Sequence, residues 1–136
     1  MIVVLNKPGS SNKNIIKIDG YDTWNVDVTL ARICAPLLKE FKQKSKTTYT
    51  NVDEADVPEG LFKGTDDIEI WQNILDQMIY SFEELSDPCS EDKFYKFDSD
   101  DSSDYLSFDK DAYTQWSNKV NRGTFLFGKY FKHLWS

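Results

Sequence analysis

The sequence has few of the residues on which catalytic and metal sites are commonly built. It contains one histidine, His133, and two cysteines, Cys34 and Cys89. A single histidine excludes a site made of several histidines, and the two cysteines lack the close spacing of a zinc-binding or redox pair. There is no nucleophilic serine turn, no phosphate-binding glycine loop, no HExxH pair and no dinucleotide-binding glycine pattern. The sequence therefore favours a binding protein over an enzyme, and it gives no sign of a cofactor.

The N-terminus also lacks a long apolar run. Met1 to Leu5 is apolar but ends at Asn6–Lys7–Pro8, which is too short for a signal-peptide core or a membrane span. Cys34 lies among regularly spaced apolar residues, as a small buried thiol does in a reducing compartment. We therefore expect a cytoplasmic protein that does not contact a membrane.

Basic residues are scarce in the middle of the chain. The formal net charge is −7, but residues 51–111 hold 19 acidic and 4 basic side chains, a net of −15, and the rest has a net of +8. An acidic surface of this kind argues against direct contact with nucleic acid phosphates. It suits either a solvated face or a basic partner, and the sequence leaves both open.

The apolar residues that are present predict a single domain, residues 1–136. Hydrophobic residues make up 40% of the chain and aromatic residues 15%, enough for a core. In the segments 20–42, 66–85 and 110–134 they recur every three or four positions, as on one side of an α-helix. Asp66 followed by Glu69 has the spacing of a helix N-terminal cap. The predicted buried stripes are Val26, Leu30, Ile33, Cys34, Leu37, Leu38 and Phe41; Trp71, Ile74, Leu75, Met78, Ile79 and Phe82; and Tyr113, Trp116, Val120, Phe127, Tyr130, Phe131 and Leu134.

Short β-rich runs add two hairpins to these helices. Residues 2–6 and 14–19 flank a loop and predict an N-terminal hairpin with one face covered by the helices. Residues 94–97 and 105–108 flank an Asp/Ser-rich turn and predict a second small hairpin, although the nine acids of 86–111 also suit a disordered segment. The predicted fold is mainly α (α+β), a three-helix bundle core with an N-terminal β-hairpin and a second hairpin near residues 94–108.

The Asp/Ser-rich turn also has the spacing of a calcium-binding loop. Its loop positions 1, 3, 5, 7 and 12 are Asp98, Asp100, Ser102, Asp104 and Asp109. A serine stands where the loop needs glycine, and the last ligand is an aspartate in place of the longer glutamate. We therefore do not expect a metal.

Four blocks of the sequence resemble a known family. TWNVDVTLARICAPLLKEF, residues 23–41, is similar to the pattern TW-S-x-D-x-TLA-x-x-I-x-P-x-L-K of a family of small, largely uncharacterised bacteriophage proteins. VDEADVP (52–58) resembles the family's DDEDVP segment. WQNILDQMIYSFE (71–83) resembles its W-x-x-V-L-D-E-M-I-W-A-F-E helix, and NRGTFLFGKYFKHLW (121–135) its LFGKYY-x-x-LW ending.

The match covers roughly half of the chain, in the family's order, with some departures. Asn25 replaces a serine, Gln77 replaces a glutamate, Tyr80–Ser81 replaces tryptophan–alanine, and one residue is added within 122–124. The resemblance implies a shared fold and a phage origin, and hence action in the host cytoplasm. It leaves the activity open.

Aromatic and charged residues near the predicted helix ends suggest a ligand pocket. Aromatic rings stack on bases, carboxylates accept hydrogen bonds from exocyclic amines, and Arg and Lys bind phosphates. Our leading hypothesis is a counter-defence protein that sequesters a small nucleotide signal in an aromatic, polar-rimmed pocket, with a homo-oligomer interface as one place for it. The candidate ligand-binding residues are Trp24, Asp27, Trp71, Glu83, Trp116, Arg122, Lys129 and Tyr130.

Two other functions compete with this hypothesis. The acidic middle suits a protein–protein inhibitor that covers a basic host surface or mimics nucleic acid. Paired carboxylates suit a small hydrolase, with Glu83 acting together with Asp27 or Asp76. Ordinary core packing and surface charge also account for all of these residues, so the sequence alone does not choose between these functions.

Overall fold

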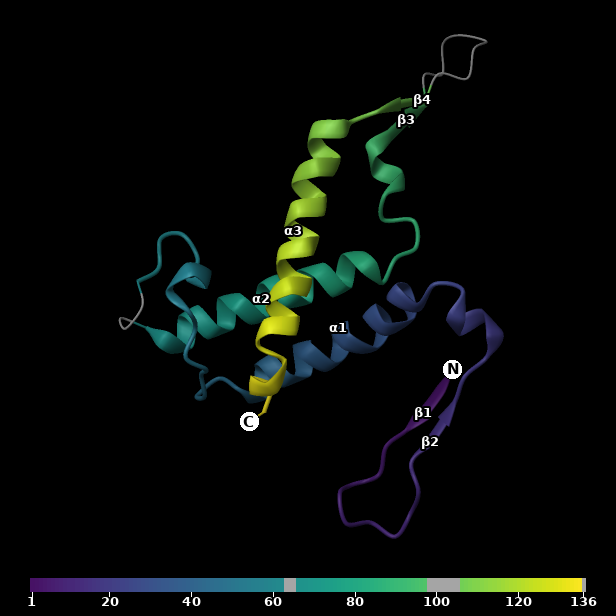
Figure 1. Ribbon diagram of the computed structural model, residues 1–136, viewed down its shortest axis with the longest axis vertical. Coiled ribbons are helices and arrows are strands. Elements are labelled where there is room, and N and C mark those ends of the chain that lie inside the picture. Colours follow the sequence, from purple (N-terminus) through teal and green to yellow (C-terminus); the bar gives the residue numbers. More distant parts are fainter. Residues whose placement is uncertain (63–65, 98–105, 136) are drawn as a thin grey trace.

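A computed structural model describes residues 1–62, 66–97 and 106–135. Within them the chain forms three long helices, α1 (Val26–Lys44), α2 (Asp67–Leu85) and α3 (Lys110–Lys129). The central helix is α2, which packs against both α1 and α3. In Figure 1, α1 runs alongside α2 and α3 crosses α2 steeply. The predicted mainly α core is confirmed.

Two antiparallel hairpins complete the fold, as predicted. The first pairs β1 (Ile2–Val4) with β2 (Ile15–Lys17), and the second pairs β3 (Tyr95–Phe97) with β4 (Leu106–Phe108). Short 3₁₀ turns lie between the main elements. They are η1 (Gly20–Thr23), η2 (Glu54–Asp56), η3 (Asp92–Phe94) and η4 (Phe131–His133).

Most of the calcium-like segment, Asp98 to Asp104, lies outside the described residues. Its last position, Asp109, caps α3 instead, accepting a hydrogen bond from the Ala112 amide at 3.1 Å. Within the part of the chain that the structure describes, no group of three or more His, Cys, Asp or Glu side chains could hold a metal ion. In the same residues, no helix is both long enough and apolar enough to cross a bilayer.

The stripe predicted for α2 is buried in full. Its six apolar side chains are at most 8% exposed, and Ile74, Leu75 and Met78 are completely covered. Asp66 caps the helix as its spacing with Glu69 predicts, because its carboxylate accepts from the Glu69 amide at 2.9 Å. Helix α2 thus supplies most of the hydrophobic core.

Small residues allow α3 to cross α2 at close range. A Cβ atom on Gly123 would overlap the hydroxyl of Ser81 and the carbonyl oxygen of Gln77. The Ser81 hydroxyl is buried and donates to the Val120 carbonyl at 2.8 Å. Gly123 therefore permits the close packing of α3 on α2. On the N-terminal side of Gly123 along α3, Trp116 and Val120 form a second, smaller buried cluster with Phe94.

The packing of α1 differs from the prediction. Only Leu38 of the predicted stripe is buried, and the side of α1 that meets α2 is made by Ala31, Ala35 and Leu38. Two alanines allow the backbones of α1 and α2 to approach closely, and Lys39 and Lys42 of α1 form ion pairs with α2. As a result, α1 is turned so that much of its apolar stripe faces away from the core. The exposed stripe residues are Val26, Leu30, Ile33 and Leu37, at 50%, 52%, 40% and 64%.

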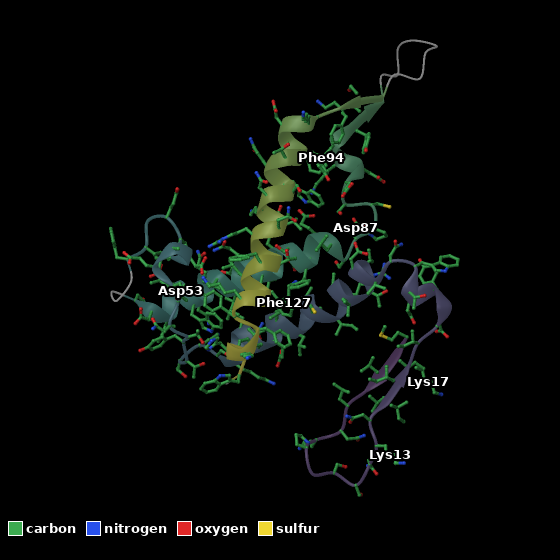
Figure 2. The ribbon with its side chains drawn as sticks, in the orientation of Figure 1. Lys13, Lys17, Asp53, Asp87, Phe94 and Phe127 are labelled. Carbon is green, nitrogen blue, oxygen red and sulfur yellow. The ribbon has the colours of Figure 1, made fainter. Side chains whose placement is uncertain are left out.

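The N-terminal hairpin also differs from the prediction, since neither of its faces is covered. Val3 on one face and Val4 on the other are 42% and 45% exposed. The hairpin is attached through η1 and extends away from the helices (Figure 1). Figure 2 shows Lys13 and Lys17 along this extension, far from Phe127 in the helical core. The prediction failed because alternation shows which residues share a face, but not whether the fold places anything over that face.

Candidate functional site

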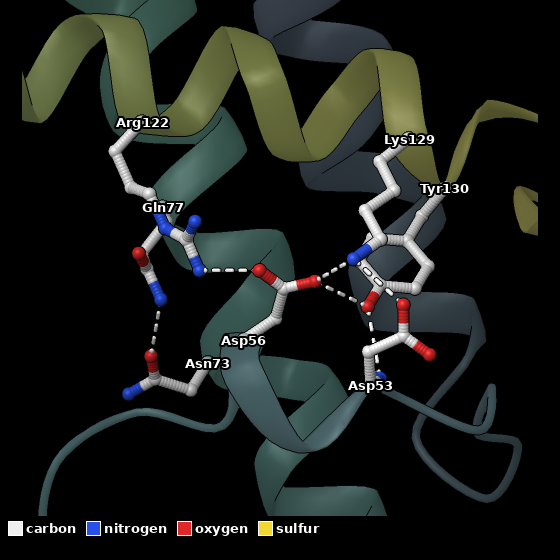
Figure 3. A network of polar contacts seen from close by, with 7 residues as sticks. All are labelled: Asp53, Asp56, Asn73, Gln77, Arg122, Lys129 and Tyr130. Atoms are coloured by element: carbon white, nitrogen blue, oxygen red, sulfur yellow. Dashed lines mark hydrogen bonds and ion pairs between the residues drawn. The ribbon is translucent and has the colours of Figure 1, made fainter.

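The polar residues predicted near the end of α3 meet at one buried carboxylate (Figure 3). The loop between α1 and α2 carries Asp56, which is 4% exposed, into contact with α3. Its Oδ1 accepts from the Arg122 guanidinium at 2.7 Å, and its Oδ2 accepts from Lys129 Nζ at 2.5 Å and from the Tyr130 hydroxyl at 2.8 Å. Lys129 also pairs with Asp53 at 2.7 Å. Two acids and two bases therefore balance in charge.

This network shifts the pKa values of Asp56, Lys129 and Tyr130 so that each keeps the protonation state in which it makes its contacts. Burial raises the pKa of the Asp56 carboxyl, but hydrogen bonds from Lys129, Tyr130 and Arg122 outweigh it and hold that pKa below its usual value. Hydrogen bonds to Asp53 and Asp56 raise the pKa of Lys129. Burial and the Asp56 carboxylate raise the pKa of the Tyr130 hydroxyl. Arg122 and Lys129, predicted to bind a phosphate, are thus engaged in fastening the loop onto α3.

The predicted aromatic residues do not gather around one pocket. Trp24 is 76% exposed, just before α1, and its ring lies 5.5 Å from that of Tyr21. Trp71 is buried in the main core, where its ring meets the edge of the Tyr130 ring at 5.9 Å. Trp116 is buried in the second cluster, against Phe94. The structure brings together Trp71, Arg122, Lys129 and Tyr130, but it leaves Trp24 and Trp116 elsewhere.

The predicted carboxylates are also separated. Glu83 pairs with Lys39, and Asp76 pairs with Lys42 at 2.5 Å. These two acids lie seven positions apart on α2, a rise of about 10.5 Å, which exceeds the usual spacing of a hydrolytic carboxylate pair. Asp27 lies in the first turn of α1. The hydrolase hypothesis gains no support from this arrangement.

A second feature is a set of large apolar side chains that the core leaves exposed. It has two parts, the exposed stripe of α1 and the face of the hairpin that carries Val3, and all of its side chains are between 39% and 68% exposed. Alternate strand residues share a face, and Ile16 is opposite Val3 in the register. We call this surface the apolar face. Its residues are Met1, Val3, Leu5, Ile16, Ile18, Val26, Leu30, Ile33 and Leu37.

Two recesses show how the apolar face is shaped. One, of about 280 Å³, lies between the hairpin and α1, with Met1 and Val3 on one wall and Ile33 on the other. The second, of about 430 Å³, lies between α1 and the C-terminal end of α3, and Leu37 borders it together with Phe131. Its lining residues are Cys34, Leu37, Leu38, Phe41, Phe127, Phe131 and Leu134. The two recesses therefore lie beside α1, and polar side chains of Tyr21, Asp22, Thr29 and Arg32 complete the lining of the first.

Comparison with protein-family models, curated proteins and solved structures finds no match. The likeness to the phage family therefore stays a prediction, and the function must be argued from the geometry.

Sequence reasoning overlooked the apolar face because it assigned every apolar stripe to the core. Two signals could have found it. Ala31 and Ala35 form a second, narrower stripe on α1, suited to a closer contact than the large residues allow. The hairpin also has apolar residues on both faces, with Val3 on one and Val4 on the other, which is more than a single layer of helices can cover. Asp56 was overlooked because its partners lie about 70 residues away in the sequence.

Proposed function

We propose that this protein acts by binding another protein chain through its apolar face, and not by catalysis. The observation that carries the proposal is the exposed stripe of α1, in which Leu30 and Leu37 are more than half exposed, although Ala31, Ala35 and Leu38 of the same helix are buried. Contiguous apolar surface of this kind on a soluble domain usually marks a binding site. Covering a large apolar side chain contributes about 1.5–3 kcal/mol, so a partner that covers several gains substantially.

The charges around the stripe support this proposal. Lys39 and Lys42 point to α2, where they are ion-paired with Glu83 and Asp76. Arg32 donates to the Ser86 carbonyl at 3.2 Å. A partner that docks on the stripe would therefore bury few unpaired charges, which favours an interface. From the resemblance described above we propose a phage origin and action in the host cytoplasm.

The test places a photo-reactive amino acid, benzoylphenylalanine, at Leu30 in the full chain expressed in bacteria. Phe125 on α3 is the matched control site, because it is 53% exposed against 52% for Leu30. We expect irradiation to link the Leu30 probe, but not the Phe125 probe, to a discrete protein band whose sequence mass spectrometry identifies. Equal labelling from both sites, or none from Leu30, would remove the proposal.

Nucleotide sequestration is the second candidate, supported by a different recess. Tyr49 and Trp135 are 55% and 71% exposed, and they border a recess of about 190 Å³ together with His133, Thr47, Thr48 and Thr50. Exposed rings of this kind stack on bases. The volume is below the roughly 300 Å³ of a typical small-molecule site, so it would hold a base and leave the phosphates outside. Calorimetric titration with cyclic and linear nucleotides tests it, and no heat for any of them would exclude it.

A further inference from the structure

The first strand of the N-terminal hairpin has an unprotected edge. Within the described residues the hairpin is a two-stranded sheet, so β1 and β2 each have one side without a strand neighbour there. Natural proteins protect such edges with charged residues. Strand β2 and its flanks carry Lys13, Lys17 and Asp19, whereas Met1 to Leu5 has no charged side chain. The free edge of β1 is thus open to pairing, and that of β2 is protected.

The hairpin is also too small to be stable alone. Each of its strands has three residues, and a two-stranded hairpin in water is marginally stable at best unless further strands or a helix cover it. The apolar side chains of its strands are exposed on both faces, from 42% for Val3 to 60% for Ile16. The sheet therefore needs further strands or a covering helix, and the described part of the chain packs neither closely against it.

We propose that a second copy of this chain supplies the further strands, through antiparallel pairing of β1 with β1 of the second copy. This inference rests on the proposed function, since it names the partner of the same apolar face. Pairing about a two-fold axis at Val3 sets Val3 opposite Val3 of the second copy and Ile2 opposite its Val4. All of these pairs are apolar and no like charges face one another, so the edge is self-complementary as a two-fold interface requires.

The resulting four-stranded sheet also explains the exposed stripe of α1. A two-fold axis perpendicular to the sheet keeps the Val3 faces of both hairpins on the same side. Within one chain that face already borders a recess with Ile33 of α1. The dimer therefore places α1 of both copies on the same side of one continuous sheet, with Ile33 of each stripe next to the Val3 face.

The surface area of the protein agrees with this arrangement. The chain exposes 10113 Å², whereas a compact monomer of its 15.8 kDa exposes about 7,300 Å². A stable interface of standard size buries about 800 Å² on each partner. The excess over a compact monomer is thus larger than the area that each partner buries in an interface of ordinary size.

Sedimentation equilibrium of the purified full chain tests the dimer through the pair at the axis. We expect wild type to sediment at twice the 15.8 kDa chain mass. Val3→Lys and Val3→Asp each place two like charges opposite one another, and we expect each alone to sediment as a monomer. An equal mixture of the two sets opposite charges at the axis, and we expect it to recover the dimer. Phe125→Lys on α3 is the control and should remain dimeric.

Each other outcome overturns the pairing. The first is a wild type that stays monomeric up to the highest soluble concentration. The second is a Val3→Lys chain that still sediments as a dimer. The third is a mixture of the two variants that stays monomeric although each variant keeps the helical circular dichroism of wild type. A monomeric wild type together with a Leu30 photo-crosslink to a different protein would reject the dimer and leave the proposed function standing. A monomeric wild type with no Leu30 crosslink to any protein would reject both.

Discussion

Helices α1 and α2 each have 19 residues and an apolar stripe of similar spacing, but the fold uses the two stripes differently. The six stripe side chains of α2 are at most 8% exposed, whereas four of those on α1 are between 40% and 64% exposed. The stripe of α2 holds α1 and α3 together. The stripe of α1 faces outward, and two alanines make its contact with the core. The comparison teaches that periodicity identifies the apolar side of a helix but not what covers it.

The largest expected effect comes from comparing a buried leucine of the α2 stripe with an exposed leucine of the α1 stripe. Leu75 of α2 is completely buried, so Leu75→Ala leaves a cavity and should lower the free energy of unfolding by about 2–5 kcal/mol. Leu30 of α1 is 52% exposed, so Leu30→Ala should change it by less than about 0.5 kcal/mol in the monomer. Urea denaturation followed by circular dichroism, at a concentration too low for association, measures both. A loss above 2 kcal/mol for Leu30→Ala would show that the core covers its side chain.

The next effect tests how closely α3 approaches α2. Gly123→Ala places a methyl group against Ser81 and the Gln77 carbonyl, so the helices must shift, at a cost of about 1–3 kcal/mol. Gly128→Ala is the matched control in the same helix, because nothing lies within 4 Å of its added Cβ. Alanine has the higher helix propensity, so the control should be neutral or stabilised by up to about 1 kcal/mol. Thermal unfolding of both variants decides this, and equal melting temperatures would refute the close crossing.

Asp56 provides a smaller test, because it fastens the loop between α1 and α2 to α3. Asp56→Asn weakens the contacts to Arg122 and Lys129, whose side chains are 39% and 31% exposed and keep access to water. We therefore expect a loss of about 1–2 kcal/mol in urea denaturation at pH 7. Asp53→Asn is the control: its side chain is 65% exposed and pairs with Lys129 alone, so its effect should be clearly smaller.

The same variant predicts a pH dependence with a definite sign. The pKa of Asp56 is lower in the folded chain than its usual value of 3.8. Its contribution to stability is therefore complete above about pH 4 and is lost as the pH falls through the folded value. The difference in unfolding free energy between wild type and Asp56→Asn should narrow below pH 4. A difference that stays constant down to pH 2 would contradict the shift.

The parts of the fold that could be predicted from the sequence depend on local signals. Asp66 with Glu69 marked the start of α2, and the stripe from Trp71 to Phe82 marked its buried side, because both follow from helix geometry alone. The environment of Trp116 could not be predicted, since it depends on Phe94 from another element. The same holds for Arg122 and Lys129. Their predicted closeness to Tyr130 is present, but Asp56, which joins them, lies far away in the sequence.

The smallest expected effect concerns the ion pairs between α1 and α2. Glu83→Gln removes the partner of Lys39, and these two side chains are 45% and 53% exposed. Exposed pairs contribute about 0–1 kcal/mol. The free energy of unfolding, measured by urea denaturation, should therefore fall by less than about 1 kcal/mol, and 1 M salt should remove the difference from wild type. If α1 is instead held to α2 mainly by this pair, the variant will lose more than 2 kcal/mol and the loss will depend on salt. Ala31→Leu tests the other contact, because a larger side chain at a fully buried position of α1 forces the two helices apart. It should cost about 1–3 kcal/mol, and this loss should not respond to salt. Alanine packing therefore predicts the larger, salt-independent loss for Ala31→Leu, and ion pairing predicts the larger, salt-dependent loss for Glu83→Gln.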